Sequence, residues 1–233
     1  MKKLVILTGA GISAESGIST FRDSGGLWEQ YPVMQVASHT GWRKDPVLVN
    51  NFYNERRRQL FSTQPCGAHK LLASLQDQYD VRIITQNVDD LHERAGSTNV
   101  IHLHGELLKV CSSADVDNPR YWKTLTPDNY EVKPGEKAGD GSLLRPYIVF
   151  FEEAVPMISA ATQEVSEADI FVIIGTSLNV YPAAGLIDFA KPDTPIFLID
   201  PKDVNTPNER HVTHIKAGAT AGVTQLIDDL KKL

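Results

Sequence analysis

Short apolar runs alternate with segments of helical periodicity along most of the chain. Several runs are apolar almost throughout, which is typical of parallel strands covered on both faces. We interpret six of them as strands, over residues 3–8, 81–85, 99–104, 147–151, 170–175 and 195–200. Helical patterns cover residues 46–61, 66–79, 88–95, 157–167, 182–190 and 221–231. The alternation predicts an α/β fold with a doubly wound, mostly parallel sheet.

Two segments interrupt the alternation. Residues 29–62 contain one long helical pattern and no strand, and residues 106–144 are rich in Pro, Gly and Asp, which is typical of loops. We expect these two insertions to form a smaller lobe beside a larger domain, the whole being one unit over residues 1–233. The larger domain would comprise residues 1–28, 63–105 and 145–233.

Composition excludes several classes of protein. The net charge of −6 and the pI near 5.6 argue against direct binding to nucleic acid. No apolar stretch approaches the ~18 residues that a membrane span needs, and the run at residues 4–7 is too short for a signal peptide. The two cysteines do not indicate a disulfide scaffold, so we expect a reducing, cytoplasmic location.

A glycine-rich turn follows the first predicted strand. Gly9, Gly11 and Ala14 fit the G-x-G-x-x-G/A pattern, in which a tight turn and the start of a helix, here near Ile12, bind a dinucleotide pyrophosphate. An ordinary strand-to-helix turn is the alternative. Hydride-transferring enzymes of this type carry an acidic residue about 20 positions further on, at a strand end. That region here, "STFRDSGGLWEQYP", has no strand before it, which disfavours a dehydrogenase.

Three further polar clusters follow predicted strands. Gln86, Asn87 and Asp89 lie just past a strand end, where they could recognise a carboxamide and ribose hydroxyls, or else cap the next helix. In "HLHGEL", His102 and His104 share one face of a strand, and His104 is placed to act as a general base. The sequence Gly-Thr-Ser at 175–177 suits phosphate or ribose oxygens, or a capped turn.

Together these clusters resemble the sirtuin family, the NAD-dependent protein-lysine deacylases. The motifs GAGIS…SGI.TFR, TQNVD.LH..AG, HLHGEL and GTSL.V.PA occur in that order, and the resemblance runs from about residue 4 to about residue 225. It implies a Rossmann-like domain, an NAD cleft and consumption of NAD. In such enzymes the acyl-lysine oxygen attacks the nicotinamide ribose and nicotinamide leaves, and the resemblance implies that His104 is the base in forming O-acyl-ADP-ribose.

The resemblance also implies the residues that contact NAD. Asp200 stands where Asn is common at the adenosine ribose, and Ala219 would lie near adenine. The expected NAD-binding residues are Gly9, Ala10, Gly11, Ser13, Glu15, Thr20, Phe21, Arg22, Trp28, Gln86, Asn87, Asp89, Gly175, Thr176, Ser177, Asp200 and Ala219.

The segment "FYNERRRQL" indicates a branch of the family. Tyr53 and Arg56 are three apart on one helix, so they share a face and could bind a carboxylate. The pair matches the Tyr-x-x-Arg of sirtuins that remove succinyl and malonyl groups, and Thr20 resembles that branch too. A solvated basic face is the alternative, because Arg56–Arg58 are consecutive.

The segment "RPYIVFFEEAVP" corresponds to the one that pairs with the substrate peptide in sirtuins. We expect contacts from residues 149–152 through backbone hydrogen bonds, with Val149, Phe151 and Glu152 as the binding residues. Glu152 stands where Gly is usual.

Typical sirtuins hold a structural zinc with two C-x-x-C pairs, which this chain lacks. Cys111 occupies the first position and Ala114 the second, and no Cys or His lies between 112 and 145. We therefore predict no zinc, and expect packing to hold the small lobe. The candidate packing residues, which could equally lie at the surface, are Tyr121, Trp122, Leu125 and Tyr130.

The sequence thus predicts an NAD-dependent deacylase whose partners are acyl-lysine proteins. Two other functions stay open: an ADP-ribosyltransferase that modifies protein, and a non-catalytic module that binds NAD.

Overall fold

The computed structural model describes residues 1–18, 32–206 and 211–233. Among the residues expected to bind NAD, Thr20, Phe21, Arg22 and Trp28 lie outside the described residues. Within the described ranges, no helix is long and apolar enough to cross a membrane.

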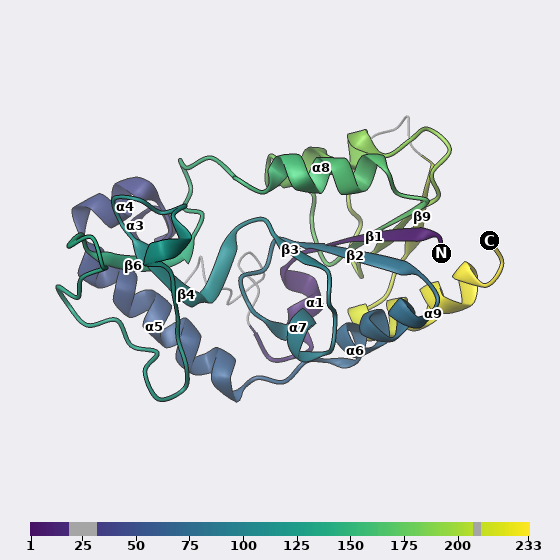
Figure 1. The fold of residues 1–233 in the computed structure, drawn as a ribbon. Coiled ribbons are helices and arrows are strands. Elements are labelled where there is room, and N and C mark those ends of the chain that lie inside the picture. The colour runs from purple at the N-terminus through teal and green to yellow at the C-terminus, as the bar shows by residue number, and fades with distance from the viewer. Residues whose placement is uncertain (19–31, 207–210) are drawn as a thin grey trace.

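The α/β prediction is confirmed by a six-stranded parallel sheet with the order β3-β2-β1-β7-β8-β9 (Figure 1). Taken along the chain, the six strands have the 3-2-1-4-5-6 order of a Rossmann fold. The strands are β1 (Lys3–Thr8), β2 (Asp80–Thr85), β3 (Val100–His102), β7 (Ile170–Ile174), β8 (Ile196–Ile199) and β9 (Val212–Ile215).

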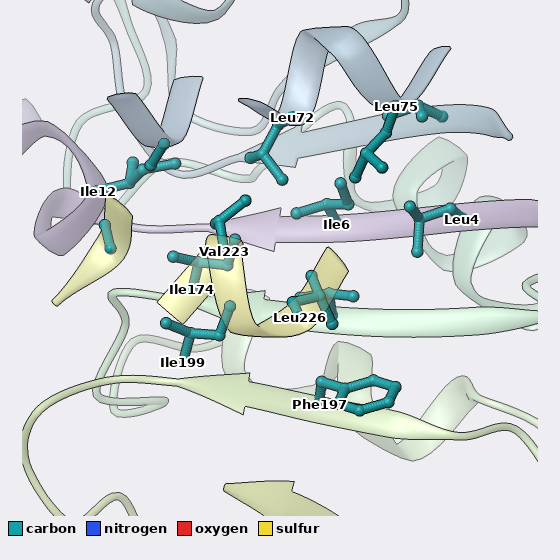
Figure 2. Packing of buried hydrophobic residues seen from close by; sticks show 14 of the residues in the cluster. Leu4, Ile6, Ile12, Leu72, Leu75, Ile174, Phe197, Ile199, Val223 and Leu226 are labelled. Carbon is teal, nitrogen blue, oxygen red and sulfur yellow. The ribbon is translucent and has the colours of Figure 1, made fainter. Parts of the chain in front are cut away.

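The central strand β1 is buried on both faces, which explains its continuous apolar sequence. Leu4 and Ile6 point into one apolar cluster, and Val5 and Leu7 into the other. The first cluster lies under α1 (Ala10–Ala14), α6 (Gly67–Ser74) and α9 (Ala219–Leu230), as Figure 2 shows for its central residues. On the opposite face α8 (Ile158–Ser166) and the 3₁₀ helix η3 (Ala183–Phe189) cover the sheet (Figure 1).

A second, antiparallel sheet lies beside the first and has the order β5-β4-β6. Its strands are β5 (Lys123–Thr124), β4 (Gly105–Ser112) and β6 (Leu144–Ile148). It packs with α3 (Val33–Val36), α4 (His39–Lys44) and α5 (Pro46–Ser62), which lie on the same side of the molecule in Figure 1. The two insertions expected from the sequence therefore pack against each other.

The small sheet is held by buried groups of α5 as well as by apolar packing. Asn54 pairs with both backbone groups of Val132, and Arg57 donates to Leu107 O at 2.8 Å and to Asn54 Oδ1 at 2.8 Å. Of the four residues expected to hold the lobe, Leu125 is buried and Tyr130 packs on its cluster. Trp122 lies on the Tyr147 ring, and Tyr121 is half-buried.

Several element predictions need correction. The strand predicted at 147–151 is β6, at 144–148, and it belongs to the antiparallel sheet. The sixth parallel strand is β9, an edge strand whose alternating Val-Thr-His-Ile gives no continuous apolar run. The segment predicted as loops contains β4, and residues 29–62 contain α3, α4 and α5 rather than one helix.

Helix boundaries also differ. The pattern at 66–79 is divided into α6 and the 3₁₀ helix η1 (Leu75–Asp77), and a further 3₁₀ turn, η2 (Pro119–Tyr121), lies in the small lobe. The pattern at 88–95 yields only α7 (Leu91–Arg94), because the preceding residues form an irregular polar loop.

Candidate functional site

Three of the predicted clusters meet at the carboxyl edge of the large sheet. Residues 9–11 follow β1, residues 86–89 follow β2 and residues 175–177 follow β7. The strand order reverses between β1 and β7, and open α/β sheets bind ligands in the crevice at such a point. The topology therefore brings these chain segments, distant in sequence, to one place.

Glycine is required where the turn at residues 9–11 touches the turn at residues 175–177. Gly11 N donates to Gly175 O at 2.9 Å, and a Cβ on Gly11 would lie 2.6 Å from Gly175 Cα. Gly175 itself has a φ of +62°, which L side chains rarely adopt. Glycine at position 11 thus permits a close approach between two backbone turns, and its expected contact with the NAD pyrophosphate stays a prediction.

Asn87, Asp89 and Ser13 form a buried network below the turn. Asn87 Nδ2 donates to Gly9 O and to Ser13 Oγ, both at 3.1 Å, and Ser13 Oγ donates to Asp89 Oδ2 at 3.0 Å. Asp89 Oδ1 accepts from Leu91 N at 3.2 Å, so this side chain also serves the start of α7, as the capping alternative anticipated. Burial raises the pKa of Asp89, although its hydrogen bonds act in the opposite direction.

Gln86 and Thr176 link the ends of β2 and β7 across β1. Gln86 Nε2 donates to Thr176 Oγ1 at 3.0 Å, and the Thr176 hydroxyl also accepts from Leu178 N at 3.3 Å. Ser177 is exposed beside them, and Ala10 is half-buried at the start of α1.

His104 lies directly beyond the end of β3, beside this edge. Its Nδ1 is 2.9 Å from Gln86 O, and because a carbonyl only accepts, Nδ1 carries the proton. Burial lowers the pKa of His104, so the ring is neutral at pH 7 and Nε2 keeps a free lone pair. That tautomer is the form a general base requires.

Three further residues expected to bind NAD make contacts within the chain itself: Glu15, Asp200 and Ala219. Glu15 accepts from the backbone N of Thr220 at 3.1 Å and from its hydroxyl, at the first turn of α9. Asp200 accepts from Lys202 N at 2.8 Å, in the turn after β8. Ala219 is buried in the apolar cluster under α9. Their expected roles toward NAD stay predictions.

Tyr53 and Arg56 lie on α5, near the aromatic residue Phe150. The Tyr53 ring is buried, 6.0 Å from the Phe150 centroid, and burial raises the pKa of its phenol. The charges that act on that phenol belong to Arg145, Arg57 and Glu153. The Arg56 guanidinium lies over the Phe52 ring at 5.5 Å.

The expected peptide-pairing segment is partly occupied by internal hydrogen bonds. Val149 N donates to His104 O at 3.0 Å, and Phe151 N donates to Ala37 O at 2.9 Å. Glu152 has a φ of +77°, the conformation that glycine adopts readily, and its carboxylate accepts from Thr40 N at 2.8 Å. Any pairing with a peptide therefore depends on the remaining backbone groups of this segment.

Sequence reasoning missed two ion pairs at the site. Arg145 binds Glu153 through two hydrogen bonds, of 2.7 and 3.0 Å, and Glu153 Oε2 also accepts from Phe150 N at 2.9 Å. His102 pairs with Glu93 of α7 at 2.7 Å. The prediction that His102 and His104 share one face of a strand stays a prediction, because β3 ends at His102 and His104 lies in the following turn, and nothing local in the sequence identified either ion-pair partner.

The fold and this loop cluster define an α/β protein of the Rossmann-like, nucleotide-binding class. A comparison with protein families matches residues 9–182 to the Sir2 family. The chain is 60% identical to an NAD-dependent protein deacylase of Bacteroides thetaiotaomicron over 226 residues, which is 97% of each chain. It is 52% identical to one of Helicobacter pylori over 230 residues, 99% of this chain and 98% of the relative.

Solved structures agree with the sequence comparisons. A Sir2 homolog–NAD complex has a TM-score of 0.86 and 38% identity, and the match covers 99% of this chain and 90% of the other. A Sir2 protein bound to acetylated peptide has a TM-score of 0.79 and 27% identity, covering 98% and 93%. This chain belongs to the Sir2 family.

Proposed function

We propose that this protein is an NAD-dependent protein-lysine deacylase that prefers acyl groups ending in a carboxylate. The observation that carries the first part is the neutral His104, oriented by Gln86 O at the carboxyl edge of the sheet. The name of the Bacteroides relative and the NAD and acetyl-peptide complexes of the solved neighbours support the same activity.

The residues at this edge fit an NAD molecule. The Gln86 amide suits a carboxamide or ribose hydroxyls, and the Ser177 hydroxyl is exposed beside it, while the Nδ2 group of Asn87 is held in the buried network below the turn. Bound NAD would supply a glycosidic bond to nicotinamide, whose cleavage opens a sugar position for the acyl group. The protein's part is to hold His104 with its proton on Nδ1, so that Nε2 accepts a proton from a ribose hydroxyl.

The preference for an acidic acyl group rests on the different surroundings of three consecutive arginines. Arg58 pairs with Glu131 at 3.1 Å, and Arg57 is buried against Leu107 O. Arg56 is half-buried and, within the described residues, its buried Nε has no hydrogen-bond partner. A buried, unpaired guanidinium N–H is costly, and a carboxylate is the ligand that would satisfy it best. A uniformly solvated basic face does not describe these three side chains.

We propose that the enzyme has no structural zinc, because the residues present do not fit a four-cysteine site. The chain has two cysteines, with Cys66 beside α6 and Cys111 buried in β4. At the lobe position, the Ser112 hydroxyl instead bonds Asp140 and Ser142 and accepts from the N–H groups of Ala114 and Asp115. We expect the enzyme to work in the cytoplasm on acyl-lysine proteins, without direct contact to nucleic acid.

The direct experiment incubates acetyl-, succinyl- and malonyl-lysine peptides with the protein and NAD, and follows peptide and nicotinamide by mass spectrometry. We expect deacylated peptide and nicotinamide in equal amounts, with the succinyl or malonyl peptide fastest. ADP-ribose retained on protein would indicate the transferase instead, and NAD binding without nicotinamide release would indicate a non-catalytic module.

The carboxylate preference has its own test in the same arginine run. Arg56→Met should lower kcat/KM for the succinyl peptide at least tenfold, since a charge-assisted pair is lost, and change deacetylation much less. Arg58→Met is the matched control, because it removes an exposed arginine that pairs with Glu131. Equal losses on both peptides would contradict the preference.

A further inference from the structure

His102 is a half-buried histidine whose two ring nitrogens both have partners. It ends β3, two residues before His104, and its side chain is 10% exposed. Nε2 lies 2.7 Å from Glu93 Oε1, and Nδ1 lies 3.2 Å from Asn87 O. The side chain thus joins β3 to α7 and to the polar loop that follows β2.

The identity of these partners fixes the charge of the ring. A backbone carbonyl and a carboxylate can only accept, so Nδ1 and Nε2 must both carry protons, and His102 is an imidazolium. Burial lowers the pKa of His102, but the Glu93 carboxylate and the Asn87 carbonyl raise it more, and the net shift is upward. In turn His102 brings the pKa of Glu93 below its ordinary value, although burial opposes this.

The two histidines hold consecutive carbonyls of one loop. His104 donates to Gln86 O and His102 donates to Asn87 O, so one short stretch of chain holds the backbone of residues 86 and 87. The side chain of Asn87 is bonded to Gly9 O and Ser13 Oγ. Because Gln86 and Asn87 are consecutive, a shift of the Asn87 backbone would also move the Gln86 carbonyl that orients His104.

We propose that His102 is a positioning residue: its imidazolium, held between Glu93 and the Asn87 carbonyl, fixes residues 86–89 for NAD and keeps the Gln86 carbonyl on His104. This proposal rests on the proposed NAD-dependent function. His102 acts through the loop, and His104 remains the residue assigned to proton transfer.

The charged groups around His102 come from every element packed against it. Glu93 is on α7, Asp89 is in the loop and Glu106 is on β4, and all three interact with the imidazolium. Glu106 is itself paired with Lys109 at 2.7 Å. The neighbouring His92 is neutral, because burial depresses its pKa and His102 lowers it further. The positive charge also opposes the burial-driven rise in the pKa of Asp89.

Two substitutions remove the interaction from either side. His102→Asn and Glu93→Gln should each raise the Kd for NAD, measured by calorimetry without peptide, by about ten- to a hundredfold, as is usual when a supporting contact of a site is lost. The same variants should raise the KM for NAD more than they lower kcat. Asp80→Asn is the matched control, because it breaks the Arg82–Asp80 pair at the opposite end of β2 and should leave the Kd unchanged.

The pH profile separates positioning from mere fold support. As the pH rises through the raised pKa of His102, the ring loses its second proton and NAD binding by the wild type should weaken. In Glu93→Gln that weakening should begin at lower pH, and in His102→Asn it should disappear. An unchanged Kd in both variants, or the same pH profile in wild type and His102→Asn, would overturn the proposal.

Nitrogen NMR of the wild-type protein gives a check that no folding defect can affect. Both nitrogens of His102 should be protonated at pH 7, and His104 only at Nδ1. A neutral His102 at pH 7 would refute the proposal, whatever the variants do. If instead NAD binds as expected but no nicotinamide is released with any acyl peptide, the proposed function fails while the binding results still decide the role of His102.

Discussion

Gly105 and Gly141 have nearly the same backbone conformation in very different surroundings. Their φ angles are +84° and +83°. A Cβ on Gly105 would lie 2.1 Å from Tyr147 O, whereas a Cβ on Gly141 would meet no atom within 4 Å. Gly105 directly follows His104, so the backbone that must move to admit a side chain is the backbone that carries the proposed base.

We predict that Gly105→Ala lowers kcat at least a hundredfold and destabilises the fold by about 3 kcal/mol or more, since a clash with backbone adds to the conformational strain. Gly141→Ala should cost only about 1 kcal/mol, from the left-handed conformation alone, and leave kcat unchanged. Urea unfolding and steady-state nicotinamide release measure the two effects. Similar results for both alanine variants would contradict the steric argument.

The three arginines of α5 show what single residues reveal in sequence and what they do not. The i, i+3 spacing correctly placed Tyr53 and Arg56 on one helix. The burial of Arg57 could not be predicted, because its partner Leu107 O on β4 becomes a neighbour only when the insertions pack together, although Asn54 is one turn away on the same helix. Burial lowers the pKa of the Arg57 guanidinium to about 10, and this desolvation is compensated by contacts far away in sequence.

At the scale of elements, α5 is the support of the small lobe. Three of its side chains reach other segments through buried hydrogen bonds: Asn50 donates to Leu144 O of β6, Asn54 pairs with Val132, and Arg57 bonds Leu107 O of β4. These polar contacts could not be read from the sequence, which indicated only an aromatic cluster. They connect α5 to β4, to β6 and to the loop at Val132.

Asn54→Ala should therefore destabilise the protein by about 3 kcal/mol, because both backbone groups of Val132 and one Arg57 N–H lose their partner in a buried place. Asn51→Ala, on the exposed side of the same helix, should change the free energy of unfolding by no more than about 0.5 kcal/mol. Denaturant titration of the two variants measures the difference. A loss in Asn51→Ala as large as that in Asn54→Ala would argue against this support.

A chelator gives the complementary test for the lobe. If hydrogen bonds and packing hold it, incubation with 1,10-phenanthroline should leave the melting temperature and the deacylation rate unchanged. A fall in both, reversed by added Zn²⁺, would show that the lobe depends on a metal.

The strands show why some elements were predictable and others were not. The strands β1 and β7 are buried on both faces, so their apolar runs gave correct positions. The strand β9 lies at the sheet edge and β4 lies in the small sheet, and both mix polar with apolar residues. The convergence of the three site loops was predictable only through the family resemblance, since no local pattern specifies which strands become neighbours.

At the scale of the whole molecule, two buried histidines connect the helices α6 and α7 and make the stability of the protein depend on pH. His69 of α6 and His92 of α7 contact each other, with ring centroids 4.8 Å apart. His69 Nδ1 lies 3.1 Å from Cys66 Sγ, and His92 Nε2 lies 3.0 Å from Thr8 Oγ1 at the end of β1. Burial lowers the pKa of His69 to about 4 and that of His92 well below its ordinary value.

The sign of the effect follows from where the protons bind. Between pH 6.5 and about 4 the unfolded chain protonates His69 while the folded protein does not, so falling pH stabilises the unfolded state relative to the folded one. The contribution of His69 to stability is full above pH 6.5 and should shrink by about 2 kcal/mol between pH 7 and pH 5. His92 acts in the same direction.

His69→Asn should lower stability at pH 7 but reduce its loss on acidification by that amount, since the asparagine cannot titrate. His211→Asn, at an exposed position, should leave the slope between pH 7 and pH 5 as in the wild type. Urea unfolding at several pH values gives the slopes directly. A His69→Asn slope equal to that of the wild type would mean that the acid sensitivity of the protein does not arise from His69.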